Sequence, residues 1–197
     1  MGSAQIRTQP TTGSTATSGF ILAGGRSKRM GQDKALLDWH GMPLLNHMTA
    51  LLQRATDDVK VVGRDHFPDR LPGLGPLTGI ETALTVTSTD NNLIVAVDLP
   101  LLTADFLIFL RQAAEHSKSP LLACKIRSHF PLCFAIRRRL LPDVQRRLSK
   151  GDLSIRGLIE ASDAEIVSES KLCKLGFEPA IFRNLNTPED YLNIQNQ

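Results

Sequence analysis

Short apolar runs alternate with longer segments of helical periodicity along this chain. An unbroken apolar run is typical of a strand that is buried on both faces of a sheet. Such runs predict a strand that ends at Leu22 and further strands at about 59–63, 92–98, 120–126 and 131–136. Apolar residues spaced three or four apart predict helices at about 44–54, 77–86, 103–115, 140–148 and 153–159, and a last helix that starts at Thr187.

Strands that alternate with helices along the whole chain predict an α/β fold. The pattern favours a three-layer, Rossmann-like, doubly wound and mainly parallel sheet. Residues 1–17 are rich in Thr, Ser, Gly and Gln, and Ile6 is their one strongly apolar side chain. Such a segment buries too little apolar surface to offset its ordering entropy. We therefore predict a disordered N-terminal segment at 1–17 and a single domain at 18–197.

The first predicted strand runs directly into small and then basic side chains. Phe20-Ile21-Leu22 is followed by Ala23, Gly24 and Gly25, and then by Arg26, Lys28, Arg29 and Lys34. Glycine lets backbone N–H groups approach a bulky anion, while lysine and arginine neutralise its charge. This arrangement is typical of a loop that holds a polyphosphate, although a solvated basic loop has the same composition. The loop matches neither G-x-G-x-x-G nor G-x-x-x-x-G-K-[ST], which excludes those two nucleotide fingerprints.

The clearest buried strand ends on a carboxylate. Residues 93–97 are all apolar, and Asp98 follows them. The carboxyl end of a parallel strand faces the crevice where such sheets bind ligands. Magnesium prefers oxygen ligands and commonly sits between one or two carboxylates and substrate phosphates. Asp98 is therefore the candidate metal ligand, and a routine turn aspartate is the alternative interpretation.

Composition narrows the class of protein. The net charge is +3, with no clustered basic face interleaved with aromatic residues, so we predict no nucleic-acid partner. Cys124, Cys133 and Cys173 are widely spaced, which disfavours a zinc site or a disulfide framework and indicates a reducing compartment. No apolar run approaches the roughly 20 residues that cross a bilayer, and no apolar signal core is present at the start. We therefore expect a cytoplasmic protein without membrane contact.

Four separated motifs carry a resemblance to a known family. The run Leu22-Ala-Gly-Gly-x-Ser-x-Arg-Met-Gly-x-Asp-Lys34 resembles the signature loop of the molybdenum cofactor guanylyltransferases, the molybdopterin-guanine dinucleotide biosynthesis protein A family of the nucleotidyltransferase superfamily. The other matching segments are Asp69 with Gly75-Pro-Leu-Thr-Gly79, Asp98-Leu-Pro100, and Asn184-Leu-Asn-Thr-Pro-Glu-Asp190. The resemblance implies a sheet of the nucleotide-diphospho-sugar transferase type. It also implies an enzyme that transfers GMP from GTP to the terminal phosphate of molybdenum-molybdopterin, with magnesium as cofactor.

The resemblance further implies roles for individual residues. The implied catalytic residues are Lys34, Asp98 and Arg29, and the implied metal ligand is Asp98. The implied nucleotide-binding residues are Leu22, Ala23, Gly24, Gly25, Lys34, Asp69 and Asp98, with guanine near Leu22 and Ala23 and with Asp69 as an acceptor for the base or the ribose. Asn184 and Asn186 are the implied acceptor-side residues, and their alternation predicts one shared face of a strand.

The expected partners are GTP and a molybdopterin-type small molecule. The resemblance also implies transient contacts with proteins of cofactor assembly or with acceptor enzymes. The pattern predicts no particular oligomeric state.

Two other functions stay open at this point. A nucleotidyltransferase of the same fold could use CTP with molybdopterin or act on a sugar or lactate phosphate, although Leu-Ala-Gly-Gly in place of Leu-Ala-Ala-Gly disfavours CTP. A non-catalytic module could bind nucleotide or act as a carrier in cofactor assembly, but it would not need both Lys34 and Asp98. Some relatives have asparagine after the second strand, where this chain has Gly63-Arg64.

Several other polar residues have both a structural and a functional interpretation. The arginines at 137–139, 146 and 147 fit a solvated helix face better than a contact with the acceptor phosphate. His47 fits a packed or surface histidine better than a ligand. The segments 129–131 and 154–156 resemble acceptor-side loops.

Overall fold

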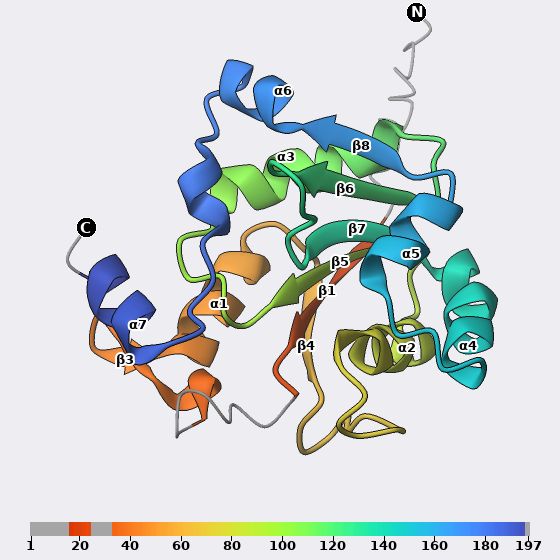
Figure 1. Cartoon of the computed structure of the whole chain (residues 1–197), viewed down its shortest axis with the longest axis horizontal. Helices are drawn as coiled ribbons and strands as arrows, with labels where there is room; N and C mark the ends of the chain where they lie inside the picture. Colours follow the sequence, from red (N-terminus) through yellow and green to blue (C-terminus); the bar gives the residue numbers. More distant parts are fainter. Residues whose placement is uncertain (1–15, 25–32, 196–197) are drawn as a thin grey trace, which may run out of the picture.

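A six-stranded sheet runs through the middle of the protein (Figure 1). The structure, a computed structural model, describes residues 16–24 and 33–195. The strand order is β4 (Asp58–Val62), β1 (Thr17–Leu22), β5 (Asn91–Ala96), β7 (Cys133–Arg137), β6 (Leu121–Lys125) and β8 (Glu165–Ser168). Strand β7 is antiparallel to both of its neighbours, and the other adjacent pairs are parallel. The prediction of a mainly parallel sheet is confirmed.

Helices cover both faces of the sheet and complete the three predicted layers (Figure 1). One face carries α1 (Leu44–Gln53), α3 (Ala104–His116), α6 (Glu169–Lys174), the 3-10 helix η3 (Pro179–Phe182) and α7 (Pro188–Gln195). The other face carries α2 (Pro76–Val86), α4 (Leu141–Ser149) and α5 (Ile155–Ala161). Two further 3-10 helices, η1 (Lys34–Leu36) and η2 (Arg138–Leu140), and a hairpin of β2 (Asp38–Trp39) and β3 (Met42–Pro43) join these elements.

Burial on both faces explains the unbroken apolar runs of the central strands. In β1, Phe20 belongs to the core with α2 and α4, whereas Ile21 belongs to the core with α1 and α3. In β5, Ile94 and Val95 divide between the same two cores. Because neither face is left to solvent, each position of these strands favours an apolar residue.

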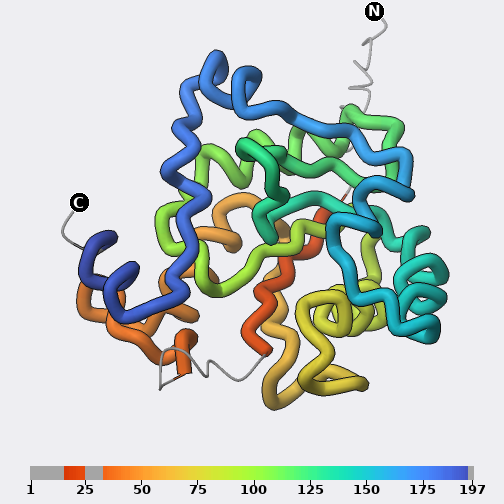
Figure 2. Tube along the Cα trace, viewed as in Figure 1, coloured from red at the N-terminus to blue at the C-terminus, as the bar shows by residue number. Residues whose placement is uncertain are grey.

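The C-terminal helix lies beside the β2–β3 hairpin, as the tube view shows (Figure 2). The hydroxyl of Tyr191 donates a hydrogen bond to the carbonyl of Asp38, which lies 153 positions earlier in the sequence. Thr187 caps α7 by accepting a hydrogen bond from the N–H of Asp190 at 3.1 Å. The predicted start of the last helix is thus confirmed, and the hydrogen bond from Tyr191 holds this helix against the hairpin.

Three parts of the structure differ from the sequence-based expectations. Strand β1 begins at Thr17, one residue inside the segment predicted to be disordered, while residues 1–15 lie outside the described residues. Strand β8 and helix α6 were not predicted. The prediction that Asn184 and Asn186 lie on a strand is wrong, because residues 183–187 form neither helix nor strand. Within the described ranges, no helix is long and apolar enough to cross a membrane.

Candidate active site

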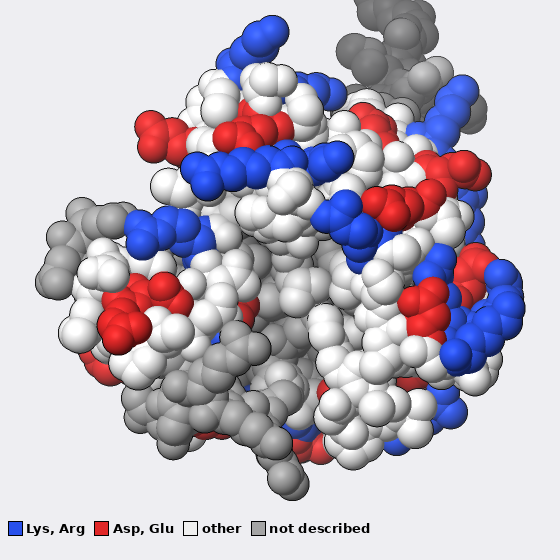
Figure 3. Space-filling model, viewed as in Figure 1, with Lys and Arg blue, Asp and Glu red and all other residues white. Residues whose placement is uncertain are grey.

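Three neighbouring parallel strands, β4, β1 and β5, end at the same edge of the sheet. Backbone hydrogen bonds join the loops that follow them. The N–H of Ala23 donates to the carbonyl of Val62 at 3.0 Å, and the N–H of Val97 donates to the carbonyl of Leu22 at 3.1 Å. The chain therefore leaves these three strands side by side, in the crevice where sheets of this type bind ligands. The face that carries the ends of β1 and β5 is hollowed near its centre, and lysine and arginine side chains border the hollow (Figure 3).

An ion pair joins the loops after β1 and β5. Lys34 Nζ lies 2.9 Å from Asp98 Oδ2. Lys34 also donates to Asn186 Oδ1 at 3.1 Å, and Asn184 Nδ2 donates to Asp98 Oδ1 at 3.3 Å. The structure therefore brings together four of the predicted site residues, which come from three distant parts of the sequence.

The backbone as well as the side chains holds the C-terminal segment against Asp98. The N–H of Leu185 donates to the carbonyl of Asp98 at 2.9 Å, and the Leu185 side chain is fully buried. This anchor lies between Asn184 and Asn186 and directs both amides toward the ion pair. Contact with the ion pair, rather than a shared strand face, explains why the two asparagines alternate.

Glycines permit a close approach of two loops beside this ion pair. A Cβ on Gly63 would lie 2.4 Å from the Cα of Gly24, and Gly63 has a positive φ of 84°. A Cβ on Gly24 would lie 2.8 Å from Asp69 Oδ2. A Cβ on Gly79, at the start of α2, would lie 3.6 Å from Asp69 Oδ1. The carboxylate of Asp69 is thus surrounded by three positions that carry no side chain.

Asp69 presents an unused acceptor at this place. Its Oδ1 is buried and has no hydrogen-bond partner among the described residues. Burial raises the pKa of the Asp69 carboxyl; a hydrogen bond from Thr78 opposes this shift, and the charge of Glu81 adds to it. A buried carboxylate oxygen without a donor is costly, and a ligand N–H group that reached Oδ1 would relieve that cost.

The side chains of Leu22 and Ala23 are buried, so a ligand at this loop would meet mainly backbone. Gly24 is exposed at the start of the signature run. The predicted site residues Gly25 and Arg29 lie outside the described residues.

Sequence reasoning missed a function for Arg64, which follows β4. Its Nε donates to the carbonyl of Ala23 at 2.9 Å, and one of its terminal nitrogens forms an ion pair with Asp33. Asp33 in turn caps η1 by accepting from the N–H of Ala35 at 3.1 Å, and η1 carries Lys34. The hydrogen bond from Arg64 lowers the pKa of the Asp33 carboxyl, against an opposing effect of burial. A basic residue directly after the Gly63 turn was the available signal.

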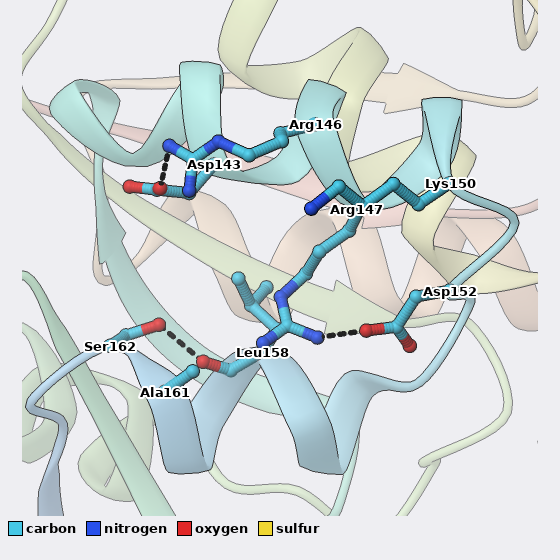
Figure 4. A pocket seen from close by; sticks show the side chains of 8 residues that line it. All are labelled: Asp143, Arg146, Arg147, Lys150, Asp152, Leu158, Ala161 and Ser162. Carbon is cyan, nitrogen blue, oxygen red and sulfur yellow. Dashed lines mark hydrogen bonds and ion pairs between the residues drawn. The ribbon is translucent and has the colours of Figure 1, made fainter.

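The basic residues of α4 lie in a different place. Arg147 and its neighbours line a pocket of about 220 Å³ between α4 and α5, on the face of the sheet that carries α2 (Figure 4). Arg147 pairs with Asp152 and donates to the carbonyl of Gly157 at 2.7 Å, and Arg146 pairs with Asp143. These guanidinium groups already bond to carboxylates and a carbonyl of their own helix pair. They fit the structural interpretation rather than a contact with the acceptor phosphate.

The loop between β6 and β7 lies nearer to Asp98. The N–H of Ala96 donates to the carbonyl of Leu132 at 2.8 Å, which joins this loop to the end of β5. Phe130 lies on the loop with the Arg156 guanidinium 5.5 Å from the centre of its ring and Lys125 Nζ 5.9 Å from it. Arg156 also pairs with Glu160 and donates to the carbonyl of Ser128, so Lys125 is the cation that this ring leaves available at the same edge of the sheet.

The donor set around Asp98 suits a metal ion that arrives with its substrate. Among residues 16–24 and 33–195, no three His, Cys, Asp or Glu side chains lie close enough to hold a metal ion together. Asp98 supplies one carboxylate, and the amide of Asn184 lies beside it. Magnesium bound to substrate phosphates and water needs no more than one or two protein carboxylates. One carboxylate with an amide beside it therefore fits magnesium that is bound to a nucleotide.

These features define a Rossmann-like α/β protein with a charged site at the carboxyl edge of its sheet. The sequence matches the family model of the MobA-like NTP transferase domain over residues 19–166. The chain belongs to this family.

A relative in sequence agrees with this assignment, and two solved structures share the fold. The molybdenum cofactor guanylyltransferase of Xanthomonas euvesicatoria pv. vesicatoria is 35% identical over 194 residues, which cover 89% of this chain and 93% of the relative. Molybdopterin-guanine dinucleotide biosynthesis protein A from Archaeoglobus fulgidus has a similar fold, with a TM-score of 0.73 at 21% identity, covering 91% of this chain and 97% of that one. Rv0371C from Mycobacterium tuberculosis H37Rv, solved in complex with manganese, shares the fold with a TM-score of 0.63 at 14% identity. The match covers 93% of this chain and 100% of that one.

Proposed function

We propose that this protein transfers GMP from GTP to the terminal phosphate of molybdenum-molybdopterin and releases pyrophosphate. The product would be the molybdopterin guanine dinucleotide form of the cofactor. The activity named for the Xanthomonas relative supports this reaction, and the match covers 93% of that relative. The observation that carries the proposal is the pairing of Lys34 with Asp98 between Asn184 and Asn186.

The proposed reaction needs alignment and charge stabilisation rather than proton transfer. The acceptor phosphate is already an anion at neutral pH, so no general base is required. Lys34 would move from Asp98 to the triphosphate, where it stabilises charge on the transferred and leaving phosphates. The backbone at Gly24, together with Gly25 and Arg29, would hold the remaining phosphate oxygens.

Asp98 would hold magnesium in this reaction. Its carboxylate lies at the strand end, and Asn184 orients it by a hydrogen bond to Oδ1. When bound there, magnesium would neutralise charge on the phosphate oxygens of the nucleotide.

Asp69 would select the base. Guanine presents two N–H donors, at N1 and at the exocyclic amino group, on the edge that a carboxylate can bind in a bidentate way. The free Oδ1 of Asp69 supplies the acceptor, and the glycines around it leave the carboxylate without neighbouring side chains at those three positions. Adenine has no N–H at N1, so it would leave the buried carboxylate unsatisfied.

The acceptor would bind on the opposite side of the ion pair. Asn184 and Asn186 would contact it there, and the Phe130 ring with Lys125 would offer an apolar surface and a cation for a heterocycle that bears a phosphate. Transient contacts with proteins that supply or receive the cofactor belong to this proposal as well.

A binding test with four nucleotides separates the proposal from its alternatives. The melting temperature would be measured with GTP, CTP, ATP or UTP, each with magnesium, because a ligand that binds the folded state raises it. GTP alone should give a large shift, and label from the α-phosphate of GTP should then enter a product only when molybdopterin is added. A larger shift with CTP would indicate a cytidylyltransferase. Selective binding of GTP without transfer of label to loaded molybdopterin would favour a non-catalytic module and sink the proposal.

A further inference from the structure

His47 reaches from α1 to the turn that carries Asp98. Its Nε2 lies 3.0 Å from the carbonyl oxygen of Pro100, two residues beyond Asp98. A carbonyl oxygen only accepts, so the hydrogen must be on Nε2 of His47. This hydrogen bond joins residues that are 53 positions apart in the sequence.

Most hydrogen bonds to the turn after β5 lie before Pro100. The N–H of Val97 donates to the carbonyl of Leu22, and the side chain of Asp98 bonds to Lys34 and Asn184. Residues 97, 98, 100 and 101 are in turn conformation, beyond the last residue of β5. The N–H of Leu185 binds the carbonyl of Asp98, and the side chain of Leu99 is fully buried. The proline at position 100 has no N–H, so its carbonyl is the one backbone hydrogen-bonding group it offers. A side-chain donor that reaches this carbonyl therefore restricts the part of the turn that follows Asp98.

The imidazole of His47 packs against the β2–β3 hairpin, which restricts its orientation. The ring centre of His47 lies 5.9 Å from that of Trp39, which is itself buried in the β2–β3 hairpin. The N–H of Leu44 donates to the carbonyl of Leu37 at 2.8 Å and fixes the start of α1 against the segment after η1. Since η1 carries Lys34, the hairpin and α1 connect both members of the Lys34–Asp98 pair.

We propose that His47 is a positioning residue, which keeps the carboxylate of Asp98 opposite Lys34 and in place for the substrate. Its catalytic consequence rests on the proposed function, because Asp98 is assigned its role there. Its structural consequence does not, because the hydrogen bond from Leu185 to Asp98 reports the position of the turn in the ligand-free protein. A histidine that only fills space would affect neither the rate of the reaction nor the hydrogen bond from Leu185 to Asp98.

The test compares His47→Leu with His47→Gln and a matched control. Leucine keeps the apolar packing and removes the donor, whereas the side-chain amide of glutamine places a donor near the former position of Nε2. His116 supplies the control, because its Nδ1 lies 2.7 Å from the carbonyl of Gln112 within its own helix, away from Asp98. The first readout is hydrogen exchange of the Leu185 amide without ligand, with the Ile94 amide in β5 as the measure of global opening.

The proposal expects a specific pattern. In His47→Leu, the Leu185 amide exchanges about 10-fold faster while Ile94 is unchanged, and kcat falls about 10-fold with KM for GTP within about 3-fold. His47→Gln restores both readouts toward wild type, and His116→Leu changes neither. Unchanged exchange at Leu185 in His47→Leu, or equal defects in the leucine and glutamine variants, would overturn the proposal. Absence of transfer by the wild-type protein would instead count against the proposed function, and the exchange readout would still decide the role of His47.

Discussion

Lys34 Nζ lies 2.9 Å from Asp98 Oδ2, although the two residues are 64 positions apart in the sequence. Their side chains are 16% and 18% exposed, so solvent and salt screen this pair less than a surface ion pair. Lys34 also donates a hydrogen bond to Asn186, and Asp98 also accepts one from Asn184. The free protein thus holds a cation and an anion against each other at the place where a triphosphate and its metal ion would need both.

Asp98→Asn tests the anion of this pair. Asparagine keeps the shape and the hydrogen-bond capacity of the side chain but removes the charge that would hold magnesium. We expect kcat to fall by roughly 100-fold or more, with the affinity for GTP within about 3-fold of wild type. Pyrophosphate release and a GTP titration measure the two quantities. Turnover at the wild-type rate would remove Asp98 from the metal role.

Lys34→Ala tests the cation separately. Loss of a charge-assisted bond to phosphate should weaken GTP binding by roughly 10-fold. The matched control is Lys174→Ala, at the end of α6, which removes an equal charge from an element on which no proposed site residue lies. If both variants bind GTP as the wild type does, Lys34 does not hold the triphosphate.

Asp69→Asn should improve stability and impair selectivity. The pKa of this carboxyl is raised from its ordinary value of 3.8, so its contribution to stability is present at low pH and is lost as the pH rises through the folded-state pKa. We expect the free energy of unfolding of the ligand-free variant to rise by up to about 1 kcal/mol at pH 7, which corresponds to about 2–4 °C in Tm. This increase should vanish near pH 3.8.

The same variant should lose its preference for guanine. The affinity for GTP should fall by roughly 10-fold, while the affinity for inosine triphosphate, which lacks the exocyclic amino group, should fall less. Isothermal titration with both nucleotides measures the ratio. A variant that is more stable and binds both nucleotides as tightly as the wild type would show that Asp69 binds neither base nor ribose.

The parts of the fold that the sequence predicts well are those whose signal is local. Residues 20–22 and 93–97 are apolar on both faces because helices cover both faces of the sheet. Thr187 caps the last helix through a hydrogen bond with Asp190, three residues later, so its signal also lies in the neighbouring sequence. Strand β8 carries no such signal, since it is a short edge strand with one buried residue, Val167.

The site was predictable where side-chain chemistry follows a strand end. Asp98 and Lys34 are such residues. Arg64 was not, because its partners, the carbonyl of Ala23 and the carboxylate of Asp33, come close only in the folded chain. Alternation of polar residues has the same period as a strand and so favours a strand for Asn184 and Asn186, whereas their actual partners are Asp98 and Lys34.

Arg64→Gln should loosen both flanks of the signature loop. Arg64 holds the pKa of Asp33 below its ordinary value of 3.8, so this pair stabilises the fold above that pH and its contribution is lost as the pH falls through the folded-state pKa. We expect the free energy of unfolding to fall by about 1 kcal/mol at pH 7 and by less below pH 3, and we expect weaker GTP binding. Denaturant unfolding at the two pH values measures the difference. Asp33→Asn removes the same ion pair, so the double variant should lose less free energy of unfolding than the two single variants together. Strictly additive losses would contradict the coupling between Arg64 and Asp33.

Gly63→Ala should be the most damaging single-methyl change at the site. The new Cβ would lie 2.4 Å from Gly24 Cα and 2.5 Å from its nitrogen, and the backbone has a positive φ of 84°. Gly41→Ala is the matched control, since Gly41 has a φ of 87° but no atom within 4 Å of its Cβ position. The control should cost about 1 kcal/mol from backbone strain alone, whereas Gly63→Ala should cost about 3 kcal/mol or more and weaken GTP binding, because the loops after β1 and β4 must separate. Denaturant unfolding of the two variants compares these costs directly. Equal costs would mean that the close contact of Gly63 with Gly24 does not shape the site.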